Sequence, residues 1–167
     1  MTLTYMDFLR ASYRNLIVCK ELLSIMKCCE PHKKSQILHK VYYLSGYIIE
    51  FCYKYALFSS LNASKFESIY NFKDEDFKNK WKKDGHNFDK LKNVCSEYKI
   101  IFSSDIPYFG NNKLDEGLYN LIISWNVQIR YSLKLSNNPI SKLNENDVIR
   151  FVHLCEDILK KITEKYN

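Results

Sequence analysis

The sequence predicts an all-α fold, an antiparallel up-and-down bundle of four to five helices with one irregular excursion. The 167 residues include only 4 Gly and 3 Pro, too few for the many turns of a β-sandwich or barrel. Apolar residues recur at three- and four-residue steps through most of the chain, which is the spacing of amphipathic helices. The length suits a single domain over residues 1–167.

The first two predicted helices form the long part of the bundle. The first covers residues 4–28 and ends before Glu30-Pro31, because proline disfavours the helical conformation of the residue that precedes it. The second covers residues 34–61 and has a wide apolar face, which is typical of a central helix. Residues 62–85 are more polar and form the irregular excursion.

Three further helices complete the prediction. The third covers residues 87–101, and the fourth covers residues 114–129, with Trp125 on its apolar face. The last covers residues 144–166, with Asn144 or Asn146 as a candidate N-cap.

Charge and hydropathy limit the class of protein. The chain carries a formal net charge of +6, which permits nucleic-acid or nucleotide binding without requiring it. The longest apolar-rich stretch, residues 41–57, is interrupted by Glu50 and Lys54, so it predicts a core helix and no membrane span. The N-terminal residues lack a signal-peptide pattern, so we expect a cytoplasmic protein with reduced thiols.

The common catalytic and metal-binding motifs are absent from the sequence. It contains no phosphate-binding loop, dinucleotide fingerprint, zinc-protease motif or nucleophile elbow. Cys28, Cys29 and His32 come nearest to a metal cluster, but they do not have zinc-site spacing. No metal ion and no cofactor are therefore predicted.

Two sets of polar residues are candidates for a binding site. Glu50 and Lys54 stand four residues apart within an apolar helix, either as an ordinary ion pair or as charges at a groove or subunit contact. Arg130, next to Tyr131, could hold a phosphate with its planar fork of donors. Alternatively, it lies at a helix C-terminus and packs on Trp125 or Tyr131.

The histidines provide candidates for proton transfer. His86 precedes the third helix and could equally be a turn residue. Arg150 and His153 share a helix face, and such a pair can hold a phosphate and move the proton of an RNA 2′-hydroxyl. A solvated helix face explains the same spacing at least as well.

Three segments together resemble the HEPN domain family, in particular its bacterial stand-alone members. Residues 42–56, YYLSGYIIEFCYKYA, form an aromatic and small-residue run in which three residues separate Glu50 from Lys54. Residues 86–91, HNFDKL, begin the next helix with His86, and residues 125–131, WNVQIRY, contain Arg130.

The resemblance implies a helical bundle that commonly forms a homodimer. It implies a family of RNases, nucleotide-binding modules and partners of nucleotidyltransferases, often in toxin–antitoxin, abortive-infection or phage-defence systems. Catalytic members carry an Arg and a following His that are separated by four to six residues. This chain departs from that motif, since the interval from Arg150 to His153 is too short.

Three functions therefore stay open, and whether the chain is an enzyme is undecided. The leading one is RNA or nucleotide binding in a defence setting, at the following residues: Glu50, Lys54, Trp125, Arg130 and Tyr131. The second is a metal-independent endoribonuclease with a composite site drawn from these residues: His86, His153, Arg130 and Arg150. The third is a non-catalytic adaptor, whose Tyr-rich faces would bind a partner protein.

Overall fold

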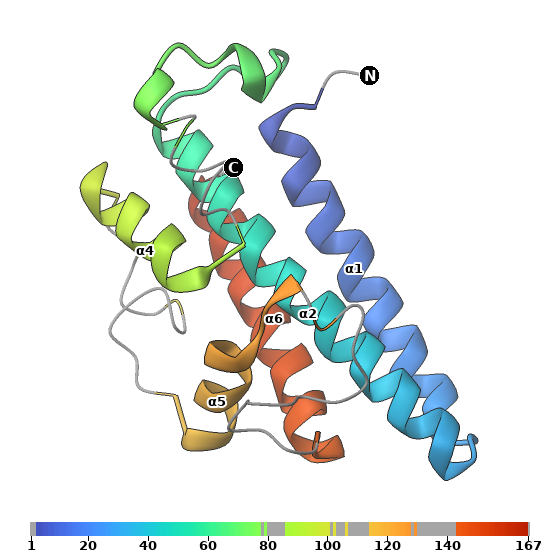
Figure 1. Cartoon of the computed structure of the whole chain (residues 1–167). Helices are drawn as coiled ribbons and strands as arrows, with labels where there is room; N and C mark the ends of the chain where they lie inside the picture. Colours follow the sequence, from blue (N-terminus) through green and yellow to red (C-terminus); the bar gives the residue numbers. More distant parts are fainter. Residues whose placement is uncertain are drawn as a thin grey trace.

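The computed structural model is all-helical over the residues that it describes, which are 3–77, 79, 86–100, 102, 106, 114–127, 129 and 143–166. No strand occurs among them, and the predicted all-α bundle is confirmed (Figure 1). The helices are α1 (Tyr5–Met26), α2 (Pro31–Ser60), a 3₁₀ helix (Ile69–Asn71), α4 (Phe88–Glu97), α5 (Glu116–Ser124) and α6 (Glu145–Tyr166).

α2 is the central helix of the bundle. It packs against α1, α4 and α6, and α5 packs against α6 (Figure 1). α1 runs antiparallel to α2 and to α6, whereas α2 and α6 run in the same direction, with α4 and α5 between them in the chain. This central place explains the wide apolar face that the sequence of α2 displays.

The ends of α1 and α2 follow from local chemistry. The Thr4 backbone N–H donates to the Asp7 carboxylate at 2.8 Å, within a capping box that begins α1. α2 begins at Pro31, three residues earlier than predicted. Proline lacks an N–H and has a fixed φ, so it suits the first position of a helix as well as it ends the one before.

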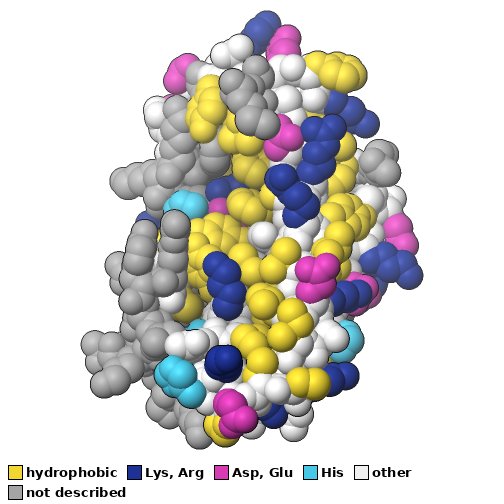
Figure 2. All heavy atoms as spheres, turned by 90° about the vertical axis from the view of Figure 1, so that its right-hand side faces the viewer, with side chains coloured by type: hydrophobic (Ala, Val, Ile, Leu, Met, Phe, Trp, Pro, Cys, Tyr) yellow, Lys and Arg dark blue, Asp and Glu magenta, His cyan; other side chains and the backbone are white. Residues whose placement is uncertain are grey.

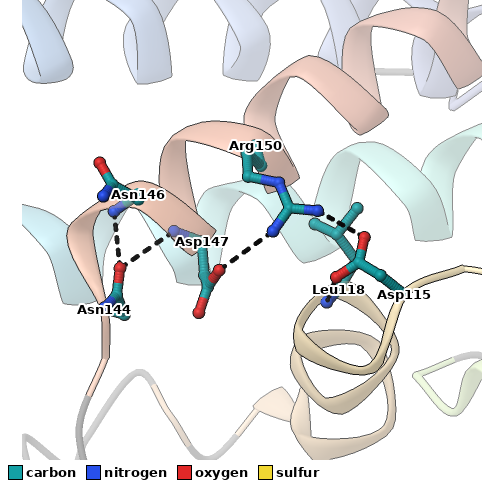
Figure 3. Close-up of polar contacts among 6 residues, drawn as sticks. All are labelled: Asp115, Leu118, Asn144, Asn146, Asp147 and Arg150. Carbon is teal, nitrogen blue, oxygen red and sulfur yellow. Dashed lines mark hydrogen bonds and ion pairs between the residues drawn. The ribbon is translucent and has the colours of Figure 1, made fainter.

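The shorter helices differ more from their predicted ranges. α5 ends at Ser124, five residues before the predicted end, because Trp125 has extended backbone angles of φ −71° and ψ 132°. α6 begins as predicted, and the alternatives for its cap are resolved. The Asn144 side chain accepts from the backbone N–H of Asn146 at 2.9 Å and of Asp147 at 3.3 Å (Figure 3).

Tyrosine fills the core more than it covers the surface. In the part of the chain that the structure describes, five tyrosines are buried in the hydrophobic core: Tyr5, Tyr42, Tyr43, Tyr53 and Tyr55. Among the described residues, the exposed tyrosines are Tyr13, Tyr70 and Tyr119, and they belong to three different elements. Within the described part of the chain, no helix is both long and apolar enough to cross a membrane.

Candidate functional site

A buried ion pair lies in the middle of α2. Lys54 Nζ donates to Glu50 Oε1 at 2.6 Å, across one helical turn. Glu50 is 0% exposed and Lys54 is 5% exposed. The two residues therefore form the i,i+4 pair that the sequence predicts, but within the bundle rather than on its surface. Removing either member would break a buried ion pair, which is typically strongly destabilising.

His86 completes a cluster of three polar groups by binding the other oxygen of Glu50. Its Nδ1 lies 3.0 Å from Glu50 Oε2, and its side chain is 57% exposed. A carboxylate can only accept hydrogen bonds, so Nδ1 carries the proton and Nε2 is left for solvent or a ligand. We call Glu50, Lys54 and His86 the α2–α4 charge cluster.

The start of α4 holds His86 in place. Asn87, the next residue, caps α4 by accepting from the backbone N–H of Lys90 at 3.0 Å. Phe88 is buried in the core directly after the cap. His86 is thus fixed on one side by a buried carboxylate and on the other by a capped, anchored helix.

Aromatic rings pack beside the cluster. The Phe88 and Trp125 rings stack with centroids 4.8 Å apart and planes 7° from parallel. Tyr47 packs edge-on against Trp125 at 5.2 Å and against His86 at 6.4 Å between centroids. Tyr47 therefore links the predicted residue Trp125 to the charge cluster.

Trp125 itself is held as part of the core. Its Nε1 donates to the Tyr43 carbonyl oxygen at 3.1 Å, and one face of its ring is covered by Phe88. The side chain is buried, so a free stacking face for a nucleobase is not offered in this conformation. Contact between Trp125 and a ligand stays a prediction.

Arg150 lies in a different network, where it joins α6 to α5 (Figure 3). Its guanidinium donates to Asp147 Oδ1 at 3.3 Å and to the Asp115 carboxylate. Asp115 is also the N-cap of α5, accepting from the Leu118 N–H at 3.2 Å. This hydrogen bond, with help from Arg150, lowers the pKa of the Asp115 carboxyl.

His153 is exposed on α6, and its Nδ1 lies 4.0 Å from Glu156 Oε2. Neither Arg150 nor His153 has a hydrogen bond or ion pair to the α2–α4 charge cluster within the described residues. The structure thus brings Glu50, Lys54 and His86 together and leaves Arg150 and His153 apart from them. The predicted residues Arg130 and Tyr131 lie outside the described residues.

Two residues of the site were missing from the sequence prediction. Tyr47 and Phe88 connect His86 and Trp125 through ring contacts. Tyr47 precedes Glu50 by three residues, so helical spacing alone places both on one face of α2. Phe88 carries no such signal, because its contact with Trp125 joins distant parts of the chain.

The residues nearest to a metal motif do not assemble a site. His32 Nε2 lies 3.1 Å from the Gln36 amide nitrogen, and Cys29 Sγ donates to the Ile25 carbonyl oxygen. No group of three potential ligands is present among the residues that the structure describes.

Comparison with known proteins does not assign the chain to a family. No family model, no curated protein and no solved structure matches the chain. The resemblance to the HEPN family therefore rests on the three quoted segments alone.

Proposed function

We propose that the chain binds RNA or a nucleotide at the α2–α4 charge cluster. The observation that carries this proposal is Glu50, a fully buried carboxylate that uses one oxygen for Lys54 and the other for the exposed His86. Burying two charges is costly unless both are well paired. That cost makes sense if the pair serves to fix the imidazole in one orientation.

The chemistry at His86 suits a phosphate or a hydroxyl group. When protonated, Nε2 donates to an anion, and when neutral it accepts from a hydroxyl. His86 also precedes the capped N-terminus of α4, where the helix dipole favours negative charge. The net charge of +6 adds a general attraction for polyanions.

The proposal includes the further residues, the homodimer and the defence role that the resemblance to the HEPN family implies. Arg130 and Tyr131 would add a phosphate contact and an aromatic face beside the cluster. The protein would be a cytoplasmic HEPN-like homodimer in a toxin–antitoxin, abortive-infection or phage-defence system. A nucleotidyltransferase encoded next to it would support the toxin–antitoxin role, and a large defence enzyme there would support an adaptor role.

A titration with two ligands tests the binding proposal. A fluorescein-labelled single-stranded RNA and a fluorescent ATP analogue are titrated with the wild type, His86→Ala and His153→Ala. Because a hydrogen bond to a charged group contributes about 1.5–3 kcal/mol, His86→Ala should weaken binding by about tenfold or more. His153→Ala replaces an exposed histidine outside the cluster, so its affinity should match that of the wild type.

Two outcomes count against the proposal. Absence of binding to both ligands rejects it outright. Equal weakening by His86→Ala and His153→Ala would mean that the basic surface as a whole attracts the ligand and that the cluster is not its site.

A metal-independent endoribonuclease is the second candidate, and the Glu50–His86 contact favours it. A carboxylate that fixes Nδ1–H leaves Nε2 as a general base. Nε2 would take the 2′-hydroxyl proton, the 2′-oxygen would bond to phosphorus, and the 5′-oxygen would leave and gain a proton from an acid. Arg150 is engaged with Asp115 and Asp147, so the phosphate contact would fall to Arg130.

The same labelled RNA tests this candidate. After incubation in EDTA, cleavage is followed on a denaturing gel. The wild type and His153→Ala should cut the RNA, and His86→Ala should not. Cleavage that persists in His86→Ala excludes His86 as the base, and an intact substrate with the wild type excludes this activity on that RNA.

A further inference from the structure

The outward side of α1 carries large apolar side chains that the bundle leaves uncovered. Ile17 is 56% exposed and Ile25 is 58% exposed, and Tyr13 and Val18 are exposed as well. In Figure 2, which faces the side of the molecule where α1 lies, hydrophobic side chains alternate with charged ones. Large exposed apolar side chains that gather on one helix often mark an interaction surface.

Two charges of opposite sign lie within this apolar face. Arg14 and Glu21 are exposed and stand seven residues apart, which places them nearly one above the other on the helix. Neither makes an ion pair with any residue that the structure describes. By contrast, Arg10 pairs with Asp7, and Lys20 pairs with Glu156.

Arg14 and Glu21 lie at equal distances along α1 on either side of a point between Ile17 and Val18, and their charges are opposite. When two copies of a helix run antiparallel about that point, residues whose numbers sum to 35 lie opposite each other. Arg14 then faces Glu21 of the second copy, and Glu21 faces its Arg14. Successive residues are about 100° apart around the helix axis. The direction midway between residues 14 and 21 is therefore the same as the direction midway between residues 17 and 18, so both pairs are centred on one side of α1.

We propose that this face of α1 binds a second copy of the chain through an antiparallel, two-fold symmetric contact. Ile17 and Val18 would meet at the axis, with an Arg14–Glu21 ion pair on each side. A two-fold interface uses the same patch on both copies. It must therefore be complementary to itself, as the Arg14–Glu21 and Ile17–Val18 positions of this face are.

The proposed contact supplies an interface for the homodimer of the proposed function, but it uses none of the residues of the α2–α4 charge cluster. α4, which carries His86 just before its start, lies across α2 from α1 (Figure 1). A dimer formed through α1 would leave the α2–α4 charge cluster open on both copies.

Charge reversal tests the contact. Sedimentation velocity over a range of concentrations compares the wild type with Arg14→Glu, Glu21→Arg and an equimolar mixture of the two variants. Each variant alone places like charges opposite each other, so its self-association should be at least about tenfold weaker than that of the wild type. In the mixture, opposite charges face each other again at both ends of the contact, so the two variants should associate with one another.

Glu67→Arg serves as the matched control. Glu67 is exposed in the segment after α2, so reversing it changes the net charge by the same amount as Glu21→Arg and should leave association unchanged. Circular dichroism melting checks that every variant is folded. The proposal is overturned if the wild type is monomeric up to millimolar concentration, if the single variants associate like the wild type, or if the mixture does not recover.

Discussion

Gly46 owes its place in α2 to the indole of Trp125. A methyl group added at Gly46 would lie 2.0 Å from Trp125 Nε1 and 2.1 Å from Cε2. Such contacts are far inside van der Waals distance, and the ring is rigid and hydrogen-bonded to Tyr43. Only glycine lets this ring lie against the backbone of α2.

Gly46→Ala should therefore destabilise the protein, although alanine is the better helix former. The helix-propensity gain is about 1 kcal/mol, whereas overpacking a rigid neighbour costs typically about 1–3 kcal/mol and occasionally more. At contacts this short we expect the clash to dominate. Thermal unfolding followed by circular dichroism should show a lower Tm.

Gly117→Ala is the matched control for that prediction. A methyl group at Gly117 would meet the Asp115 and Asp147 carboxylate oxygens at 3.3 Å, so each oxygen would have to move by only a few tenths of an ångström. The Tm of Gly117→Ala should stay near that of the wild type or rise. A Gly46→Ala variant as stable as Gly117→Ala would contradict the role assigned to the Trp125 ring.

Among the elements, α5 depends strongly on its neighbours. It has 9 residues, and helices of this length are marginal in isolation. Asp115 caps it, and the same carboxylate binds Arg150 of α6 (Figure 3). One side chain therefore begins the helix and ties it to the bundle.

Asp115→Asn separates these two roles and gives a pH dependence. Asparagine can still cap α5 but loses the charge that Arg150 binds. Because the folded-state pKa of Asp115 is lowered from 3.8, its ionised form stabilises the fold. That stability is fully present above the unfolded-state pKa and is lost as the pH falls through the lower folded-state pKa.

Urea unfolding at neutral and acid pH measures the effect. The wild type should be modestly more stable than Asp115→Asn at pH 7, and the difference should vanish as the pH falls below the folded-state pKa. Asp115→Ala also loses the cap, so part of its deficit should persist in acid. A difference between the wild type and Asp115→Asn that is independent of pH would contradict the charge role.

At the scale of the whole molecule, the reactivity of the cysteine thiols measures how tightly the core is packed. Four are buried: Cys19, Cys52, Cys95 and Cys155. Burial raises the pKa of Cys19 to about 11 and of Cys52 and Cys95 to about 12, and it raises the pKa of Cys155 as well. A thiol reacts as its thiolate, so these side chains should be inert in the folded protein.

Thiol labelling tests this distribution. With a disulfide reagent at pH 8, Cys28 and Cys29 at the turn between α1 and α2 should react first. The other four should react only as the protein opens, and all six should react at once in denaturant. A third thiol that reacts as fast as Cys28 in the native protein would show that the core packing differs from the structure.

Much of the fold was predictable from the chain because helical periodicity is a local property. The spacing of apolar residues located α1, α2 and α6 to within a few residues, and it placed Glu50 and Lys54 one turn apart. The predicted end of α5 was wrong because Trp125 leaves the helix to reach Gly46 and Tyr43 of α2. That contact joins segments far apart in the sequence, and no local pattern reports it.

The sequence by itself determined the helical class, the order of the helices and the i,i+4 pairing of Glu50 with Lys54. Only the tertiary structure decided that this pair is buried, that His86 rather than Arg150 or His153 joins it, and that tyrosines fill the core. Helix spacing sets which residues share a face. Whether that face meets solvent, another helix or an imidazole depends on how distant segments pack around α2.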